Sequence, residues 1–323
     1  MRIFLTGGAG FIGLAVVRRL VARGDRVVAV VRDPDRSSEL DDLGVETRAG
    51  DLSRPTAIAE AMRGADAGIH LAGIYRVGIQ ARDRPRMLDA NVGATQRVLD
   101  AAALTGLGRL VHVSTVNVFG DTHGRIVDER YRRDLADGFL SYYDETKFLA
   151  HRAVEERMAS GAPVLAVMPG VTYGPRDHSA IGAQLRAAHR GTLAYQALGR
   201  SGISAVHVDD VAAGIVSALD RGRLGESYIL AGENVRLGDA IATAARVGRR
   251  RLPRLVLPDA AVRLGSLAPG WLARAAGLPD NLREVLRATL GVTYWASSAK
   301  AAADLRYAPR DLASGIRAAF EGN

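Results

Sequence analysis

The sequence predicts an α/β protein with a doubly wound parallel sheet and a smaller, partly interleaved C-terminal domain. Two features of the chain support this prediction. Short apolar runs of strand length alternate with longer stretches of helical periodicity, and uninterrupted apolar strands are typical of a sheet buried on both faces. The first strand is followed at once by three closely spaced glycines, which allow a tight turn into a helix.

The first half of the chain contains most of this alternation. Arg2–Thr6 is an apolar run, and a stretch of helical periodicity follows the glycines as far as about Arg23. Because strands that alternate with helices pair in parallel, helices should cover both faces of the sheet. Further strands are expected at Val27–Val31, Val45–Ala49, Ala67–Leu71, Arg109–Ser114 and Val164–Pro169. Helices are expected at Thr56–Arg63, Met87–Thr105 and Tyr143–Ser160.

The alternation loses its regularity after Pro169, where glycine and proline become denser and arginines cluster. We expect strands at Val206–Val208 and Ser227–Leu230 to return to the main sheet. The remaining chain should form the smaller domain, over the carboxyl ends of the strands. Helices are expected there at Arg236–Val247, Pro258–Arg263 and Asn281–Leu290.

Composition excludes several classes of protein. The chain has 323 residues, of which 48% are hydrophobic and 24% charged, as in ordinary globular proteins and unlike disordered or fibrous ones. The absence of cysteine excludes disulfides, thiolate metal sites and cysteine nucleophiles. The net charge is +8, but the basic residues are dispersed among acidic ones, so no nucleic-acid partner is expected. The seven histidines have no metal-ligand spacing, so no metal is expected.

No segment has the pattern of a membrane span or a signal peptide. The longest uncharged run, Met158–Pro175, has 18 residues and is interrupted by three prolines, whereas a span needs about 20 mostly apolar residues. The apolar stretch at the start of the chain is broken by glycines and arginines, and no cleavage site follows it. We therefore expect a cytoplasmic protein without a membrane partner.

The glycine spacing after the first strand predicts a dinucleotide site. Gly7-x-x-Gly10-x-x-Gly13 lies between a strand and a helix, where backbone N–H groups can approach a pyrophosphate and the helix N-terminus favours its charge. A tight turn without a ligand is the alternative. The contacts expected here come from Gly7, Gly10, Phe11, Ile12 and Gly13.

The end of the second strand bears on which dinucleotide is bound. NAD sites usually place an acidic residue at this strand end, but here Val31 ends the strand and Arg32 is the first charged residue. An arginine can pair with a 2′-phosphate, which favours NADP(H), while Asp33 leaves NAD(H) open. Asp51 and Leu52, after the third strand, are placed to contact the adenine, although Asp51 also fits an ordinary helix cap.

Tyr143 and Lys147 form the strongest catalytic signal. They lie four residues apart, hence on one face of a helix, whereas Tyr142 lies off that face. A phenol is a poor acid or base at neutral pH unless its anion is stabilised, and we expect the Lys147 ammonium to lower the pKa of Tyr143. Ser114 and Thr115 follow the fifth strand, where a hydroxyl could hydrogen-bond a substrate oxygen.

In their order along the chain, these motifs resemble those of the extended short-chain dehydrogenase/reductase family, within the NAD-dependent epimerase/dehydratase superfamily. The similarity covers essentially the whole chain, and the ordered set is highly specific. The matching segments are Thr6–Gly13, Gly50–Leu52, His70–Gly73, Asn91, Ser114–Gly120, Tyr143–Lys147, Pro169–Gly170, Tyr173–Pro175 and His207–Asp210.

The resemblance implies a Rossmann-type sheet and a catalytic triad of Thr115, Tyr143 and Lys147. Aligning Val118–Gly120 with the family's Val-Tyr-Gly places the catalytic hydroxyl at Thr115 rather than Ser114. The triad would act on a small-molecule carbonyl or alcohol. The family's further cofactor contacts would come from Leu71, Ala72, Gly73, Tyr143, Lys147, Pro169, Gly170 and Val171.

The resemblance also implies how the chain divides and assembles. Residues 1–170 plus about 204–233 would form the dinucleotide-binding domain, and residues 171–203 plus about 234–323 the substrate-binding domain. The helices expected at Met87–Thr105 and Tyr143–Ser160 would form a four-helix bundle across a two-fold axis, which gives a homodimer.

Within the family, the sequence favours one branch. Sugar-nucleotide epimerases and dehydratases usually carry Arg-Asp-aromatic where this chain has Ile203–Ala205, and an arginine where it has Met168. Gly202–His207 and Val292–Lys300 instead resemble the dihydroflavonol-reductase-like branch. The favoured function is NADP(H)-dependent reduction of a ketone or aldehyde, or oxidation of the alcohol. The alternatives are an NAD-dependent sugar-nucleotide epimerase/dehydratase and a non-catalytic NADP-binding regulatory protein.

Overall fold

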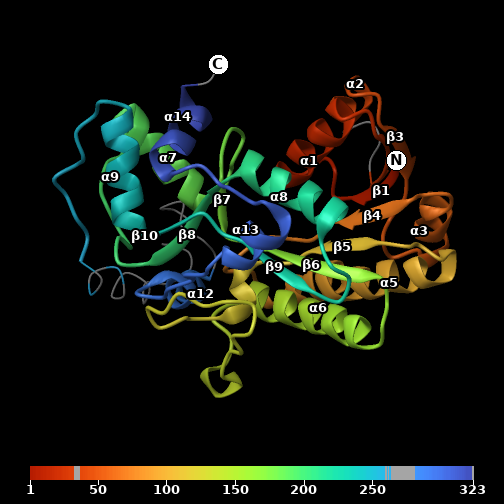
Figure 1. Cartoon of the computed structure of the whole chain (residues 1–323). Helices are drawn as coiled ribbons and strands as arrows, with labels where there is room; N and C mark the ends of the chain where they lie inside the picture. The colour runs from red at the N-terminus through yellow and green to blue at the C-terminus, as the bar shows by residue number, and fades with distance from the viewer. Residues whose placement is uncertain (33–36, 259, 261, 263–280, 322–323) are drawn as a thin grey trace.

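The computed structural model describes residues 1–32, 37–258, 260, 262 and 281–321. Its main sheet has parallel strands in the order β3-β2-β1-β4-β5-β6-β9 (Figure 1). The chain runs outward from β1 to β3 and then returns to continue on the other side, so the predicted doubly wound α/β sheet is confirmed. The strands are β1 (Arg2–Thr6), β2 (Arg26–Val31), β3 (Glu46–Ala49), β4 (Ala67–His70), β5 (Leu110–Val113), β6 (Val164–Pro169) and β9 (Ser227–Leu230).

Helices bury both faces of this sheet because successive residues of a strand face opposite sides. Ile3 and Leu5 of β1 pack with residues of α1 and α8, whereas Phe4 packs with residues of α3, α5 and α6. Apolar side chains fill both faces of the sheet, so polar side chains gather at its carboxyl edge. These helices are α1 (Phe11–Ala22), α8 (Val208–Arg221), α3 (Pro55–Met62), α5 (Ala94–Thr105) and α6 (Tyr142–Ala159).

A second, three-stranded sheet has the order β10-β8-β7, with β7 and β8 parallel and β10 antiparallel to β8. Its apolar side packs against α7, α9 and α14, where Leu185, Ile241 and Ile316 are fully buried. These elements are β7 (Val171–Tyr173), β8 (Gly202–His207), β10 (Glu233–Arg236), α7 (Ala180–Arg190), α9 (Leu237–Val247) and α14 (Leu312–Phe320).

The structure corrects one predicted strand. Val206–Val208 was expected in the main sheet, but β8 pairs with β7 and β10 in the second sheet, and Val208 begins α8. The reason lies at Gly170, where the chain leaves β6. A Cβ atom on Gly170 would lie 2.3 Å from the Ser204 carbonyl oxygen, so the two backbones meet there and β7 pairs with β8. The expected strand Ser227–Leu230 does join the main sheet as β9.

The remaining described elements are short. The expected helix at Asn281–Leu290 is α12, whereas half of the residues of the one at Pro258–Arg263 lie outside the described ranges. The division into two domains stays a prediction. Within the described ranges, no helix has both the length and the apolar character to cross a membrane. The other helices are α2 (Ser38–Asp42), α4 (Arg84–Leu88), α12 (Leu282–Thr289) and α13 (Ala299–Leu305).

Candidate active site

The glycine loop between β1 and α1 has the geometry of an anion-binding turn. Gly7 has φ +77°, and the Gly10 N–H donates to its carbonyl at 3.0 Å. A Cβ atom on Gly13 would lie 2.0 Å from the Gly7 oxygen, so the helix can approach the turn only with glycine there. The first N–H groups of an α-helix, here from Phe11 onward, have no intrahelical partner. No side chain caps them in α1. These free donors fit the diphosphate of a dinucleotide.

A chain of hydrogen bonds fixes the loops beside this turn. The Ala72 N–H donates to the Thr6 hydroxyl at 3.2 Å, and that hydroxyl lies 2.7 Å from His70 Nδ1. His70 Nε2 lies 3.1 Å from the Thr95 hydroxyl, which donates to the Asn91 carbonyl. Because Thr95 uses its proton on Asn91, Nε2 must be the protonated nitrogen of His70 and Nδ1 must accept from Thr6. Burial accordingly lowers the pKa of His70 to about 3.

Asn91 lies in a single π-helical segment, Asp89–Gly93, between α4 and α5. Its side chain accepts from the Ile74 N–H at 2.7 Å and donates to the Ile74 carbonyl at 3.1 Å. It also donates to the Thr146 hydroxyl at 2.9 Å, on helix α6. The π-helical segment therefore ties the loop after β4 to α6, as π-bulges often do at functional sites.

Three neutral histidines lie near Lys147, between the sheet and α6. His70 and His112, on neighbouring strands, have ring centroids 5.4 Å apart, and His151 lies one turn after Lys147. Burial lowers the pKa of His112 well below its usual range and that of His151 to about 4. Neither ring nitrogen of His112 has a hydrogen-bond partner among the described residues. These imidazoles thus stay uncharged in the folded protein at neutral pH.

We expect these histidines to make the protein acid-labile. Their pKa values are lower in the folded than in the unfolded chain, so stability is full above pH 6.5 and falls as the pH drops toward 4. Each contributes at most about 1.4 kcal/mol per pH unit. The free energy of urea unfolding, measured between pH 8 and 5, checks this. His112→Leu should stabilise the protein more at pH 5 than at pH 8, and an identical pH slope in this variant would contradict the assignment.

The Thr115, Tyr143 and Lys147 side chains meet at the carboxyl end of β5. The Thr115 hydroxyl donates to Asn117 Oδ1 at 3.0 Å, and its contact with the Tyr143 hydroxyl acts to lower the pKa of that phenol. Lys147 Nζ donates to the Val113 carbonyl at 3.2 Å. The structure thus brings the three predicted residues together, and adds Asn117, which orients Thr115.

The electrostatics of Tyr143 differ from the sequence-based expectation. Lys147 was expected to lower the pKa of this phenol, but burial, with the Tyr75 hydroxyl nearby, raises it above its usual value. The Lys147 ammonium instead faces a backbone carbonyl, and burial lowers the pKa of Lys147 to about 8. Burial therefore favours the neutral form of both side chains, raising the pKa of Tyr143 and lowering that of Lys147.

Tyr75 lies at the surface beside Tyr143. Its ring meets the Tyr143 ring edge-on, with centroids 4.9 Å apart, yet 63% of its surface is exposed. The same segment packs Ile79 and Met87 against Tyr143, so it forms an apolar wall beside the phenol. An aromatic side chain that is exposed while touching a buried tyrosine is placed to contact a bound substrate.

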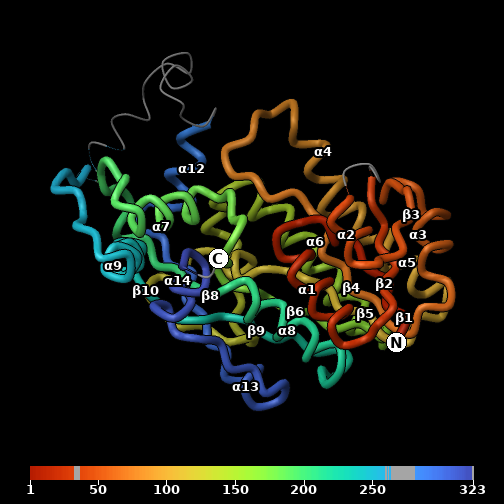
Figure 2. The backbone as a smooth tube through the Cα atoms, turned by 90° about the horizontal axis from the view of Figure 1, so that it is seen from above, coloured from red at the N-terminus to blue at the C-terminus, as the bar shows by residue number. Residues whose placement is uncertain are grey.

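Helix α12 reaches helix α6 from the C-terminal part of the chain. Glu284 is buried, accepts from the Tyr142 N–H at 2.8 Å and forms a reciprocal cap with Asn281. A Cβ atom on Gly78 would lie 2.8 Å from Val285, so α12 also touches the segment before α4. Figure 2 shows this segment and α12 on the same side of the molecule. Sequence reasoning missed Glu284, because nothing local links it to Tyr143.

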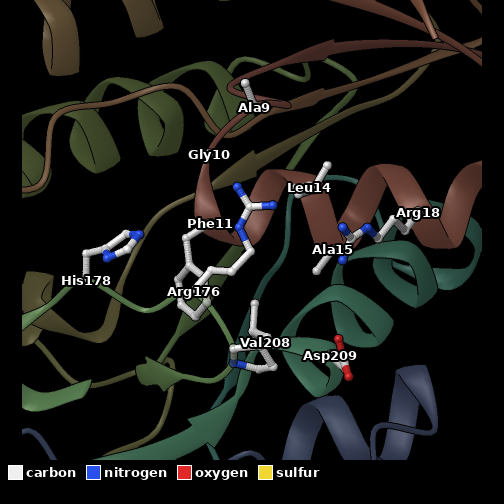
Figure 3. Close-up of a pocket in the computed structure, with 11 residues that line it drawn as sticks. Ala9, Gly10, Phe11, Leu14, Ala15, Arg18, Arg176, His178, Val208 and Asp209 are labelled. Carbon is white, nitrogen blue, oxygen red and sulfur yellow. The ribbon is translucent and has the colours of Figure 1, made fainter. Parts of the chain in front are cut away.

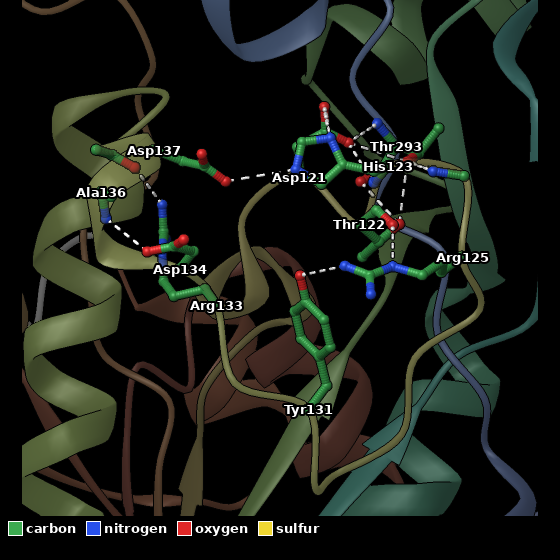
Figure 4. A network of polar contacts seen from close by, with 12 residues as sticks. Asp121, Thr122, His123, Arg125, Tyr131, Arg133, Asp134, Ala136, Asp137 and Thr293 are labelled. Carbon is green, nitrogen blue, oxygen red and sulfur yellow. Dashed lines mark hydrogen bonds and ion pairs between the residues drawn. The ribbon is translucent and has the colours of Figure 1, made fainter.

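The segment between β5 and α6 is anchored at both ends. Thr293 donates through its backbone N–H and its hydroxyl to the Asp121 carboxylate, each at 3.0 Å (Figure 4). Arg133 forms a buried ion pair with Asp144 at 3.1 Å, although burial still raises the pKa of Asp144. This pair lies next to Tyr143 and fixes the start of α6.

The residues predicted to bind the adenosine end lie at the expected edge. Arg32 is exposed directly after β2, while Asp33, Asp35 and Arg36 fall outside the described residues. Asp51 is exposed and accepts from the Ser53 N–H at 3.0 Å, which is a turn contact rather than the helix cap considered from sequence. Leu52 packs against the core below α3 and α5.

The residues predicted to line the nicotinamide end follow β4 and β6. Leu71 and Ala72 are held by Thr6, and a Cβ atom on Gly73 would lie 3.0 Å from Asn91 Oδ1. Pro169 ends β6 and Val171 begins β7. Both segments thus reach the carboxyl edge of the sheet, where ligands of doubly wound sheets bind.

Comparison with known families decides the assignment. The sequence profile of the NAD dependent epimerase/dehydratase family matches residues 3–231. The chain belongs to this family. It is similar to a putative dihydroflavonol 4-reductase of Synechocystis sp., at 29% identity over 263 residues that cover 79% of this chain and 75% of that protein. It is also similar to a 2-alkyl-3-oxoalkanoate reductase of Stenotrophomonas maltophilia, at 30% identity with 98% of each chain covered.

Solved structures of other proteins have the same fold. The crystal structure of gox2253 has a TM-score of 0.83 and 32% identity, with 98% of this chain and 96% of that chain covered. A UDP-glucuronic acid 4-epimerase from Bacillus cereus, with UDP-glucuronic acid and NAD, has a TM-score of 0.79 at 21% identity, with 99% and 98% covered. The chain is thus an NAD(P)-dependent oxidoreductase of the extended short-chain dehydrogenase/reductase type.

Proposed function

We propose that this protein uses NADP(H) to reduce a ketone or aldehyde of a small molecule, or to oxidise the corresponding alcohol. One observation carries the proposal: Thr115, the buried Tyr143 hydroxyl and Lys147 meet at the carboxyl end of β5, beside the exposed ring of Tyr75. A neutral phenol at this place is a proton donor for a carbonyl oxygen. The two reductases similar to this chain support the same reaction class.

Each residue of the triad has a distinct role in this proposal. When bound, the cofactor supplies the hydride to the carbonyl carbon. Thr115 hydrogen-bonds the carbonyl oxygen, and Tyr143 transfers its proton to that oxygen as the negative charge develops. The Lys147 ammonium stabilises the phenolate left behind and holds the cofactor ribose. To bond the substrate, the Thr115 proton turns from Asn117 Oδ1 to the carbonyl oxygen, while the Asn117 N–H continues to donate to the Thr115 hydroxyl.

The epimerase/dehydratase alternative has a specific weakness. Its arginine that holds the sugar-nucleotide diphosphate would occupy the region of Ile203–Ala205, which lies buried within β8. Met168 is likewise buried within β6, at the other position where an arginine is usual. The solved epimerase with UDP-glucuronic acid supports the shared fold only. A non-catalytic regulator would have no use for the proton donor Tyr143.

An activity panel tests the proposal. NADPH consumption, followed by the absorbance of the reduced cofactor, should appear with a 2-alkyl-3-oxoalkanoate or a dihydroflavonol. UDP-glucuronic acid incubated with NAD should yield no epimer by NMR. Epimer formation without net cofactor consumption would favour the epimerase. Tight NADPH binding with no turnover on a wide set of ketones and aldehydes would favour the regulator.

We propose that the protein is a cytoplasmic homodimer. Helices α5 and α6 pack side by side on one face, and Leu104 and Leu149 on them are 79% and 40% exposed. A four-helix bundle across a two-fold axis would cover both side chains. Light scattering at micromolar concentration should give twice the 34.3 kDa mass of one chain. Leu149→Glu should shift the mass toward the monomer, whereas a monomeric wild type would contradict the proposal.

A further inference from the structure

A pocket of about 160 Å³ opens beside the glycine loop (Figure 3). The first turn of α1, the loop after β7 and the first turn of α8 form its walls. Gly10 and Phe11 come from the glycine loop, and Arg176 and His178 from the loop after β7. Asp209, in the first turn of α8, also lines the pocket, so the pocket's attraction for an anion comes from the start of α1 together with Arg18 and Arg176.

Arg176 crosses this pocket from the second-sheet side. Figure 3 shows its side chain extending toward the first turn of α1. Its guanidinium forms an ion pair with Glu39 of α2, which follows the segment after Arg32. About half of each side chain stays exposed, at 51% for Arg176 and 46% for Glu39. The pair thus joins the loop after β7 to the part of the chain that faces the adenosine end.

The loop that carries Arg176 is held in place before any ligand binds. Arg176 has φ +68°, in the left-handed region that a residue with a side chain avoids. The next residue, Asp177, is buried and accepts from the Ser179 N–H at 2.8 Å and the Ser179 hydroxyl at 3.0 Å. Arg186 donates to the Asp177 carbonyl at 2.7 Å. Such strain, fixed by its surroundings, is typical of ligand-binding positions.

We propose that Arg176 is a cofactor-binding residue that donates to the diphosphate of the dinucleotide on the glycine loop, and leaves Glu39 when the cofactor binds. This rests on the proposed cofactor-dependent function. The diphosphate accepts from the free N–H groups at the start of α1, and Arg176 lines the same pocket from the opposite wall. A guanidinium binds phosphate oxygens with two parallel hydrogen bonds, which an exposed carboxylate matches only weakly.

This role differs from that of Arg32 in a measurable way. NADPH and NADH share the diphosphate, so the loss of Arg176 should weaken both equally. Arg32 is proposed to contact the 2′-phosphate, which only NADPH has. Glu39 competes for Arg176 in the free protein and should therefore oppose the binding of both cofactors.

Isothermal titration of the full chain with NADPH, NADH and adenosine 2′-monophosphate tests the proposal. Arg176→Gln should raise the Kd of both cofactors about 10-fold and leave that of adenosine 2′-monophosphate unchanged. Arg176→Lys should raise both Kd values by a smaller factor. Glu39→Gln should lower both Kd values by about 2–5-fold. Arg190→Gln, at the far end of α7, removes the same charge from an exposed position and should change nothing.

Three results would overturn the proposal. Unchanged Kd values for both cofactors in Arg176→Gln and Arg176→Lys would mean that Arg176 only forms an ion pair at the surface. Binding of NADPH by the wild type would in that case still support the proposed function. A higher Kd for NADPH and for adenosine 2′-monophosphate, with an unchanged Kd for NADH, would place Arg176 on the 2′-phosphate. Failure of the wild type to bind either cofactor would refute the cofactor-dependent function as well. Equal melting temperatures of the variants show that each is folded.

Discussion

Replacing Tyr143 by Phe is expected to slow reduction of a true substrate by about 10²–10⁴-fold, the usual contribution of a positioned general acid. The substitution removes only the hydroxyl beside Thr115, and it keeps the ring that packs against Tyr75 and Met87. The fold and the affinity for NADPH should change little. Single-turnover kinetics with NADPH-saturated enzyme separate the chemical step from binding and product release.

Tyr142→Phe is the matched control for this variant. The two tyrosines are neighbours on α6, but the Tyr142 ring lies under the Arg84 guanidinium, 4.9 Å away, instead of beside Thr115. This control should retain the wild-type rate. Near wild-type turnover in Tyr143→Phe, or an equal loss in both variants, would remove Tyr143 from the chemical step.

The pH dependence of the chemical step should reflect the titration of Lys147 and not that of Tyr143. Burial lowers the pKa of Lys147 to about 8 but raises that of Tyr143, so the ammonium is the group that loses its proton first as the pH rises. Lys147 therefore carries the positive charge that stabilises the phenolate only below about pH 8. This ordering follows from burial, which sequence spacing does not report.

The fold was predictable because its signals are local. An apolar strand such as Val27–Val31 and a glycine turn such as Gly7–Gly13 specify their own structure within a few residues. The strand at 202–207 is the instructive failure. Its sequence fits either sheet, and the choice depends on the contact between the Gly170 and Ser204 backbones, which are far apart in the chain.

The site was predictable only where its residues lie on one element or at one strand end. Tyr143 and Lys147 share a helix, and Thr115 follows β5. Glu284 reaches the start of α6 across 142 positions of sequence, and no pattern near either residue signals that contact. The orientation of His70 likewise depends on Thr6 and Thr95, from two other elements.

The choice of cofactor should depend on Arg32. This exposed residue follows β2 directly, and a charge-assisted pair with the 2′-phosphate should favour NADPH over NADH by about 1–3 kcal/mol, or roughly 5- to 150-fold in Kd. The lower part of this range applies if the exposed side chain stays mobile and partly hydrated. Separate titrations of the wild type with the two cofactors measure the preference.

Arg32→Ala should then bring the two Kd values together by weakening NADPH alone. Arg26→Ala, at the opposite end of β2, removes the same charge from an exposed position and serves as the control. Equal affinities in the wild type, or a variant that keeps its NADPH preference, would remove Arg32 from cofactor selection. A clear NADH preference would have a different meaning. It would assign the ribose hydroxyls to Asp33, and with an NAD-type site the epimerase alternative would gain over the reductase, because an epimerase must retain NAD through a full catalytic cycle.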